Sequence, residues 1–155
     1  MSGPGATPLF VDTGALYARF DEDDQHHQDA MAVFRGIATG DLVYRPLYVG
    51  RHVLAELATL VLQNSGPSDA AKAVDRIRES ELFTIVSPSE DGFDVACQAM
   101  HQYDDQAITL TDHLTSVLAD GRSVEYIFAF DSDFQTLGFE LVPDDTGDLA
   151  RVHNS

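Results

Sequence analysis

Two short apolar runs that each end in an aspartate constrain the fold of this chain more than any other feature. Leu9–Val11 leads directly into Asp12, and Tyr126–Phe130 leads directly into Asp131. A continuous apolar run of this length is typical of a strand that is buried on both faces of a parallel sheet. Ligands of open α/β sheets bind at the carboxyl ends of the strands. A buried strand that delivers a carboxylate to that end therefore predicts a functional site, and this chain has two.

Strand and helix signals alternate along the rest of the chain. Apolar residues at helical spacing predict a helix over residues 48–63. Short apolar segments predict further strands at residues 42–44, 82–86 and 139–142. This alternation predicts an α/β sandwich with a mostly parallel sheet and right-handed crossovers. Asp12 and Asp131 can share a site only if the first and fourth strands are neighbours in that sheet.

The length of 155 residues fits a single domain with a substantial core. We expect a flexible N-terminal lead at residues 1–7, the domain at residues 8–143 and a loose C-terminal tail at residues 144–155. No apolar run approaches the roughly 20 residues of a membrane helix, and the N-terminus lacks the pattern of a signal peptide. A single cysteine, Cys97, excludes an internal disulfide. These features predict a cytoplasmic protein without a membrane partner.

The charge of the chain is unusual, because 26 acidic residues stand against 9 Lys and Arg, which gives a net charge of −17. The acids are spread along the whole sequence, so they form an acidic coat and not a tail. Their mutual repulsion costs free energy in dilute buffer, whereas at ~1 M salt the Debye length falls to about 3 Å. The composition predicts a protein from a salt-adapted organism; the alternative is an ordinary acidic protein.

We expect the melting temperature to rise between dilute buffer and molar KCl, because salt screens the repulsion among the surface carboxylates. Thermal unfolding followed by circular dichroism over that range measures the effect. A melting temperature that falls as KCl is added would contradict salt adaptation.

Two further acids lie on predicted helices. Glu56 is the only acid of the helix at residues 48–63 and borders its apolar face, where a carboxylate needs a partner unless it reaches solvent. Asp112 follows Thr111 near a helix start, where the helix dipole alone is a sufficient reason for an acid. From the residues alone, both acids can be either structural or functional.

The segment Asp21–Asp29 is rich in acids but lacks the alternating spacing, central glycine and closing glutamate of a calcium-binding loop. We interpret it as the solvated start of a helix that continues to about Ile37. His26 and His27 point about 100° apart on a helix, which makes them poor joint metal ligands.

The order of four segments resembles the PIN domain, the fold of VapC-type toxin ribonucleases and related nucleases. The resemblance spans Leu9 to Pro143, and the segments are FVDTGALYA, VLAEL, ITLTDHLTSVLA and IFAFDSDFQTLGF. It implies a three-layer α/β sandwich with a five-stranded parallel sheet in the order 3-2-1-4-5. That order would place the first and fourth strands side by side. Together with the acidic composition, the resemblance suggests a halophilic archaeon as the source.

The resemblance also implies a metal-dependent ribonuclease that hydrolyses phosphodiester bonds in RNA. It assigns catalysis and metal binding to Asp12, Glu56, Asp112 and Asp131, and accessory roles to Thr13, Asp105, Thr111 and Asp133. Converging carboxylates cannot all stay ionised at ordinary pKa values unless a cation neutralises them. All-oxygen ligation suits Mg²⁺ or Mn²⁺, which activates water and neutralises phosphate charge.

The partners that the resemblance implies are an RNA substrate, an antitoxin protein that occupies the site, and a second copy of the chain in a homodimer. RNA affinity depends on Lys and Arg that neutralise phosphates, and this chain has few, so we expect modest affinity. The alternative function is a non-catalytic PIN-fold module that binds RNA or protein. A phosphoacceptor receiver domain is disfavoured, because it needs a lysine after its last strand and the only lysine is Lys72.

Overall fold

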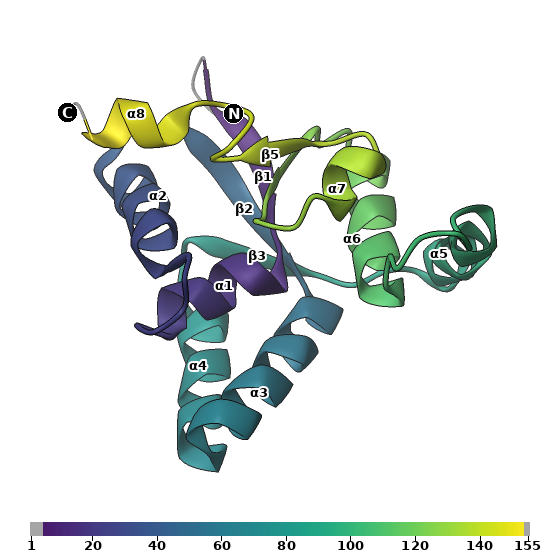
Figure 1. Ribbon diagram of the computed structural model, residues 1–155, viewed down its shortest axis with the longest axis horizontal. Coiled ribbons are helices and arrows are strands. Elements are labelled where there is room, and N and C mark those ends of the chain that lie inside the picture. The colour runs from purple at the N-terminus through teal and green to yellow at the C-terminus, as the bar shows by residue number, and fades with distance from the viewer. Residues whose placement is uncertain (1–4, 154–155) are drawn as a thin grey trace.

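A computed structural model describes residues 5–153, which form one five-stranded parallel sheet in the order β3-β2-β1-β4-β5 (Figure 1). The strands are β1 (Thr7–Val11), β2 (Tyr44–Gly50), β3 (Phe83–Val86), β4 (Tyr126–Phe128) and β5 (Glu140–Val142). The helices are α1 (Thr13–Phe20), α2 (His27–Thr39), α3 (Arg51–Ser65), α4 (Pro67–Glu79), α5 (Glu90–Gln102), α6 (Leu110–Gly121), α7 (Asp133–Thr136) and α8 (Asp148–His153). The predicted α/β class and strand order are confirmed.

Side chains alternate between two buried layers because successive residues of a strand point to opposite faces of the sheet. On β1, Leu9 and Val11 join a core cluster with apolar residues of α1–α4, whereas Phe10 joins a second cluster with residues of α6 and α7. Figure 1 shows α1–α4 on one side of the sheet and α5–α7 on the other. The central strand is therefore buried on both faces, as its continuous apolar sequence predicts. Among the described residues, no helix is long and apolar enough to cross a membrane.

The first and fourth strands are direct neighbours. Phe10 pairs with Ile127 and Val11 pairs with Phe128. The backbone N–H of Asp12 continues this pairing by donating to the carbonyl of Phe128 at 3.0 Å. This pairing brings the carboxyl ends of both strands to one place at the edge of the sheet, which is the adjacency that a shared site requires.

The second strand differs from the sequence prediction of residues 42–44. It runs from Tyr44 to Gly50, past Pro46, and α3 begins only at Arg51. The pairing of β2 with β1 is irregular between Thr7 and Leu9, opposite the stretch that contains Pro46. A proline lacks the N–H that a regular ladder needs, and this local irregularity accommodates it. The proline therefore interrupts the sequence signal but not the strand.

The acid-rich segment after α1 also differs from the prediction. Residues 21–26 form turns, and α2 begins only at His27. The side chains of Asp21 and Asp24 accept hydrogen bonds from the backbone N–H groups of Asp23 and His26 at 2.9 and 2.8 Å. Aspartates that bind the backbone in this way favour turns over helix. The segment is consequently a loop, and one of its histidines reaches the site described below.

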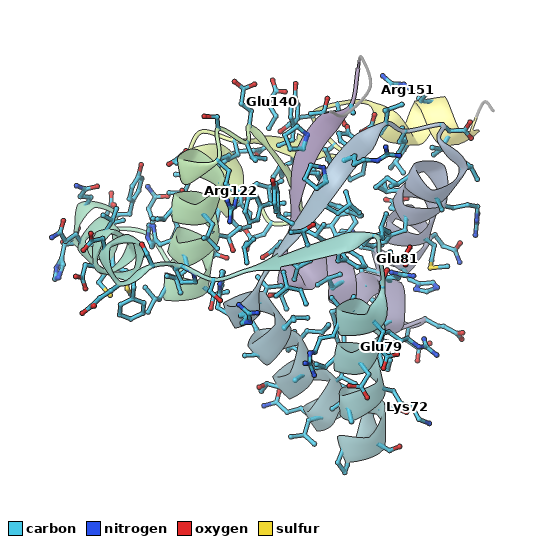
Figure 2. The ribbon with its side chains drawn as sticks, turned by 180° about the vertical axis from the view of Figure 1, so that it is seen from behind. Lys72, Glu79, Glu81, Arg122, Glu140 and Arg151 are labelled. Carbon is cyan, nitrogen blue, oxygen red and sulfur yellow. The ribbon has the colours of Figure 1, made fainter. Side chains whose placement is uncertain are left out.

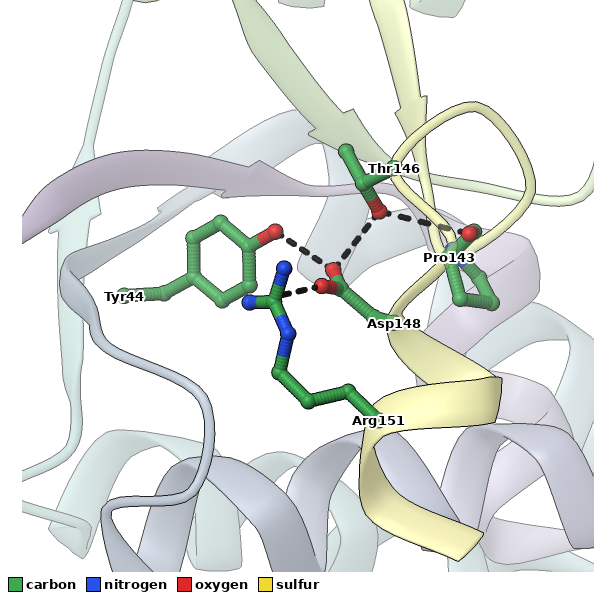
Figure 3. Close-up of polar contacts among 5 residues, drawn as sticks. All are labelled: Tyr44, Pro143, Thr146, Asp148 and Arg151. Carbon is green, nitrogen blue, oxygen red and sulfur yellow. Dashed lines mark hydrogen bonds and ion pairs between the residues drawn. The ribbon is translucent and has the colours of Figure 1, made fainter. Parts of the chain in front are cut away.

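The C-terminal segment, expected to be a loose tail from residue 144, instead contains α8, which packs beside α2. Asp148 is almost fully buried and binds three side chains (Figure 3). The hydroxyls of Tyr44 and Thr146 donate to Asp148 Oδ2 at 2.5 and 2.7 Å, and Arg151 lies 3.4 Å from Oδ1. These contacts fix α8 at the amino edge of the sheet. Residues 1–4 of the expected lead and residues 154–155 of the expected tail lie outside the described residues.

Replacing Tyr44 with phenylalanine is expected to destabilise the protein by about 2 kcal/mol, or roughly 4–8 °C in melting temperature. The substitution removes a hydroxyl that donates to the buried carboxylate of Asp148. Thermal unfolding measures the change. Tyr103→Phe is the matched control, since among residues 5–153 the Tyr103 hydroxyl has no hydrogen-bond partner and only its ring contacts a neighbour. Equal melting temperatures for the two variants would contradict this account.

Candidate metal centre

Four of the acids predicted from the sequence, Asp12, Glu56, Asp112 and Asp131, line one cavity at the carboxyl edge of the sheet. The cavity has a volume of about 400 Å³, and we call it the acidic cavity. Its acidic lining residues are Asp12, Asp24, Glu56, Asp112 and Asp131. They come from β1, the loop after α1, α3, α6 and the segment after β4, so segments far apart in the sequence contribute to the site.

Asp12 follows β1 and caps α1, with its Oδ2 accepting the backbone N–H of Gly14 at 3.4 Å. The residue is buried, with 7% of its surface exposed. Burial raises the pKa of Asp12 to about 7, and the nearby carboxylates of Asp112 and Glu56 add to this effect. Asp12 therefore changes its protonation near neutral pH in the metal-free protein.

Asp112 is the third residue of α6 and takes part in a reciprocal capping box with Thr109. Its Oδ2 accepts the backbone N–H of Thr109 at 3.3 Å, and its own N–H donates to the Thr109 hydroxyl at 3.1 Å. Burial raises the pKa of Asp112 to about 6, the bonds from Thr109 lower it, and the charges of Asp131 and Asp133 raise it further. The capping box fixes the orientation of the carboxylate toward those acids.

Asp112, Asp131 and Asp133 each place a carboxylate oxygen within 4.8 Å of the others. Asp131 Oδ1 also accepts the backbone N–H of Asp133 at 2.9 Å, which holds these two acids together. Exposure increases across the group, from buried Asp112 through half-buried Asp133 to exposed Asp131. The cluster is therefore open to solvent on one side, where a bound cation could keep water ligands.

The remaining predicted residues take different positions. Glu56 is half-buried on α3 and lies near enough to raise the pKa of Asp12. Thr13 lines the acidic cavity and is buried. Thr111 is the second residue of α6 and Asp105 is exposed in the turn before that helix, and neither of them lines the cavity.

Several lining residues of the acidic cavity were not predicted as site residues, among them Asp24, His26, Thr109 and Phe130. Thr109 could have been found, because a Thr three residues before an acid is the signature of a capping box. His26 and Phe130 also line the cavity. Their meeting depends on the packing of a loop against a strand end, and no local sequence pattern reports such a contact.

The residues present fit a divalent cation. The donors are carboxylate oxygens, the ligands that Mg²⁺ and Mn²⁺ prefer, and burial, with a smaller contribution from neighbouring carboxylates, raises the pKa values of Asp12 and Asp112. The hydroxyl of Thr13 is buried beside them without a hydrogen-bond partner among residues 5–153. A hydrated cation would neutralise the carboxylates, and one of its water ligands could bind this hydroxyl.

Comparisons with known proteins agree with the observed fold. A family model described as the PIN domain matches residues 9–140. A comparison with curated proteins finds no match. The chain is similar to the crystal structure of VapC20 from Mycobacterium tuberculosis, described as a sarcin-ricin loop cleaving toxin. The identity is 26% and the TM-score is 0.74, over 85% of this chain and 96% of that chain.

Two more distant structures share the fold. One is VapBC2 from Rickettsia felis bound to a DNA fragment from its promoter, with 14% identity and a TM-score of 0.63 over 87% of this chain and 97% of that chain. The other is FitAcB from Neisseria gonorrhoeae, with 16% identity and a TM-score of 0.62 over 86% of this chain and 95% of that chain.

Proposed function

This chain belongs to the PIN domain family, and on that premise we propose that it is a metal-dependent ribonuclease that hydrolyses phosphodiester bonds in RNA. The observation that carries the proposal is the convergence of Asp12, Glu56, Asp112 and Asp131 on one cavity at the carboxyl edge of the sheet. Buried carboxylates with raised pKa values are unfavourable for stability and are typical of functional sites. A cation-binding role accounts for that cost.

In this mechanism Asp112, Asp131 and Asp133 would hold a Mg²⁺ or Mn²⁺ ion, since their oxygens lie within 4.8 Å of one another. The ion, when bound, lowers the pKa of a water molecule and neutralises charge on the scissile phosphate. Asp12 and Glu56 lie beside this group. They would either complete the set of metal ligands or orient the attacking water. The capping box keeps the Asp112 carboxylate in place, so little ordering is required when the ion binds.

RNA is the proposed substrate because VapC20, 26% identical, is described as a toxin that cleaves the sarcin-ricin loop. The lining of the acidic cavity contains neither Lys nor Arg. Lys72 projects from α4 and Arg151 lies on α8 (Figure 2), and neither of them lines the cavity. Within the acidic cavity, phosphates of the substrate would therefore meet no Lys or Arg side chain, which is consistent with the modest RNA affinity expected from the composition.

An antitoxin protein is the proposed partner, because two solved structures with a similar fold, VapBC2 and FitAB, are each bound to a DNA fragment. A second cavity, of about 450 Å³, lies among α1, α2, α4 and β3 and offers such a partner a surface. Its lining contains Arg19, Arg76, Glu22 and His27 among apolar side chains, and burial and the charge of Arg76 lower the pKa of Arg19. We also propose a homodimer, a cytoplasmic location and a salt-adapted source.

The test of this function is the cleavage of a mixed RNA pool in molar KCl, with Mn²⁺, with Mg²⁺, and with EDTA in place of metal. We expect cleavage with either ion and none with EDTA, because the carboxylates need a cation to bind a phosphate. Asp112→Asn should lose the activity, whereas Asp144→Asn, which replaces an exposed acid outside the acidic cavity, should keep it. Binding of RNA without cleavage under all conditions would favour the non-catalytic PIN-fold module instead.

A further inference from the structure

An aromatic pair at the acidic cavity has no part in the metal chemistry. The imidazole of His26, from the loop between α1 and α2, stacks on the ring of Phe130, the residue directly before Asp131. The ring centroids are 4.2 Å apart and the ring planes differ by only 4°. Both residues are half-buried, and both line the acidic cavity. A flat aromatic surface therefore lies beside the residues proposed to bind the cation.

The stacked pair is supported from the core of the protein. Phe130 packs edge-on against Phe128 at a centroid distance of 5.8 Å, and Phe128 contacts Phe34 at 5.0 Å. Phe128 and Phe34 are both buried in the core. On the other side, the backbone N–H of His26 donates to Asp24 Oδ1 at 2.8 Å. The stacking on Phe130 restrains the imidazole and the bond to Asp24 restrains the backbone of His26 before any ligand arrives, which lowers the entropic cost of binding.

The charge of the cavity determines which kind of ligand contact this surface can supply. The acidic cavity presents five carboxylate side chains and neither Lys nor Arg, so a bound RNA strand gains little from phosphate neutralisation there. Stacking of a nucleobase on an aromatic side chain needs no positive charge and tolerates any base. Histidine is among the side chains on which unpaired RNA bases stack. Among residues 5–153, no hydrogen bond engages the imidazole nitrogens of His26.

We propose that His26 is a substrate-binding residue, and that its imidazole, supported by Phe130, stacks on an unpaired nucleobase next to the phosphodiester held at the metal centre. His26 lines the acidic cavity, and the face of its ring that Phe130 does not cover would receive the base. This inference rests on the proposed ribonuclease function, since it identifies what the same site recognises. It assigns the recognition of single-stranded RNA to base stacking and not to phosphate contacts.

The test compares two probes, a short fluorescein-labelled single-stranded RNA and the same strand with abasic nucleotides. Binding is measured by fluorescence anisotropy in molar KCl with Ca²⁺ in place of Mn²⁺. We expect His26→Ala to weaken binding of the base-containing strand about fivefold or more and to leave the abasic strand unchanged. His26→Phe, which keeps an aromatic plane, should retain binding. His26→Leu packs on Phe130 but offers no aromatic face, so it should behave like His26→Ala.

His101→Ala is the matched control, since His101 is exposed on α5 and lies outside the acidic cavity. Equal weakening of both strands by His26→Ala and His26→Leu would indicate a merely structural role and overturn the inference, as would an unchanged affinity for both. Cleavage with Mn²⁺, measured in parallel, separates this inference from the function. If the His26 variants cleave RNA as well as the wild-type protein does, the stacking role alone is overturned. If binding depends on the bases and on His26 but no cleavage occurs, the stacking role is supported and the proposed ribonuclease function is contradicted. A wild-type protein that binds neither strand overturns the inference.

Discussion

Replacing Asp12 with asparagine is expected to abolish metal-dependent RNA cleavage and to raise the melting temperature of the metal-free protein. The loss of activity should exceed about 100-fold, because the substitution removes a charged oxygen beside the cation. The gain in stability follows from the position of Asp12, which is buried next to Asp112 and Glu56. Asparagine keeps an oxygen for the N–H of Gly14 but carries no charge, so the cost of burying the charge and the smaller repulsion from Asp112 and Glu56 both disappear.

The sign of the stability change follows from the pKa of Asp12, which burial raises from 3.8 to about 7. Because the folded state holds the proton more tightly than the unfolded state, this group destabilises the protein progressively as pH rises from about 4 to about 7. Above that range the cost is constant, on the order of a few kcal/mol. The comparison of Asp12→Asn with wild type is therefore made by thermal unfolding at pH 8 with EDTA. Asp144→Asn, which changes an exposed acid, is the control. A melting temperature of Asp12→Asn below that of the wild-type protein, or retained cleavage, would contradict this explanation.

Mn²⁺ is expected to stabilise the protein strongly at pH 8 and very little at pH 5. The cation competes with protons for the same carboxylates, and the metal-free pKa values of Asp12 and Asp112 are about 7 and about 6. Below both values, the displacement of two protons weakens the apparent affinity by up to about 100-fold per pH unit. Above pH 7 the affinity should level off.

The measurement is the shift in melting temperature on adding Mn²⁺ at a series of pH values, with isothermal titration calorimetry at two of them. Asp112→Asn should remove most of the Mn²⁺-induced shift, since Asp112 belongs to the cluster with Asp131 and Asp133. Tyr44→Phe is a useful control, because it changes stability at the opposite edge of the sheet and should leave the Mn²⁺-induced shift intact. A shift that does not depend on pH between 5 and 8 would show that these carboxylates do not bind the ion.

Much of the fold could be predicted because the relevant signals are local. A run such as Leu9–Val11 must be buried on both faces, and side chains of this strand do enter both core clusters. Asp12 directly follows β1, as the sequence predicts, whereas β4 ends at Phe128 and Asp131 lies three residues beyond it. The second strand was misplaced because Pro46 normally excludes a strand interior, whereas here an irregular pairing with β1 accommodates it.

By itself, the sequence determined the buried strands, the acids at their ends and the excess of negative charge, since each of these depends only on residue type and spacing. Only the tertiary structure decided which distant side chains meet. Burial raises the pKa of the Asp12 carboxyl to about 7, and the charge of Asp112, 100 positions along the chain, adds to this effect. Asp148 in the expected tail binds Tyr44, and His26 in an acidic loop stacks on Phe130. Such contacts arise because packing the sheet and helices juxtaposes segments with no periodic relation in sequence, so no local pattern encodes them.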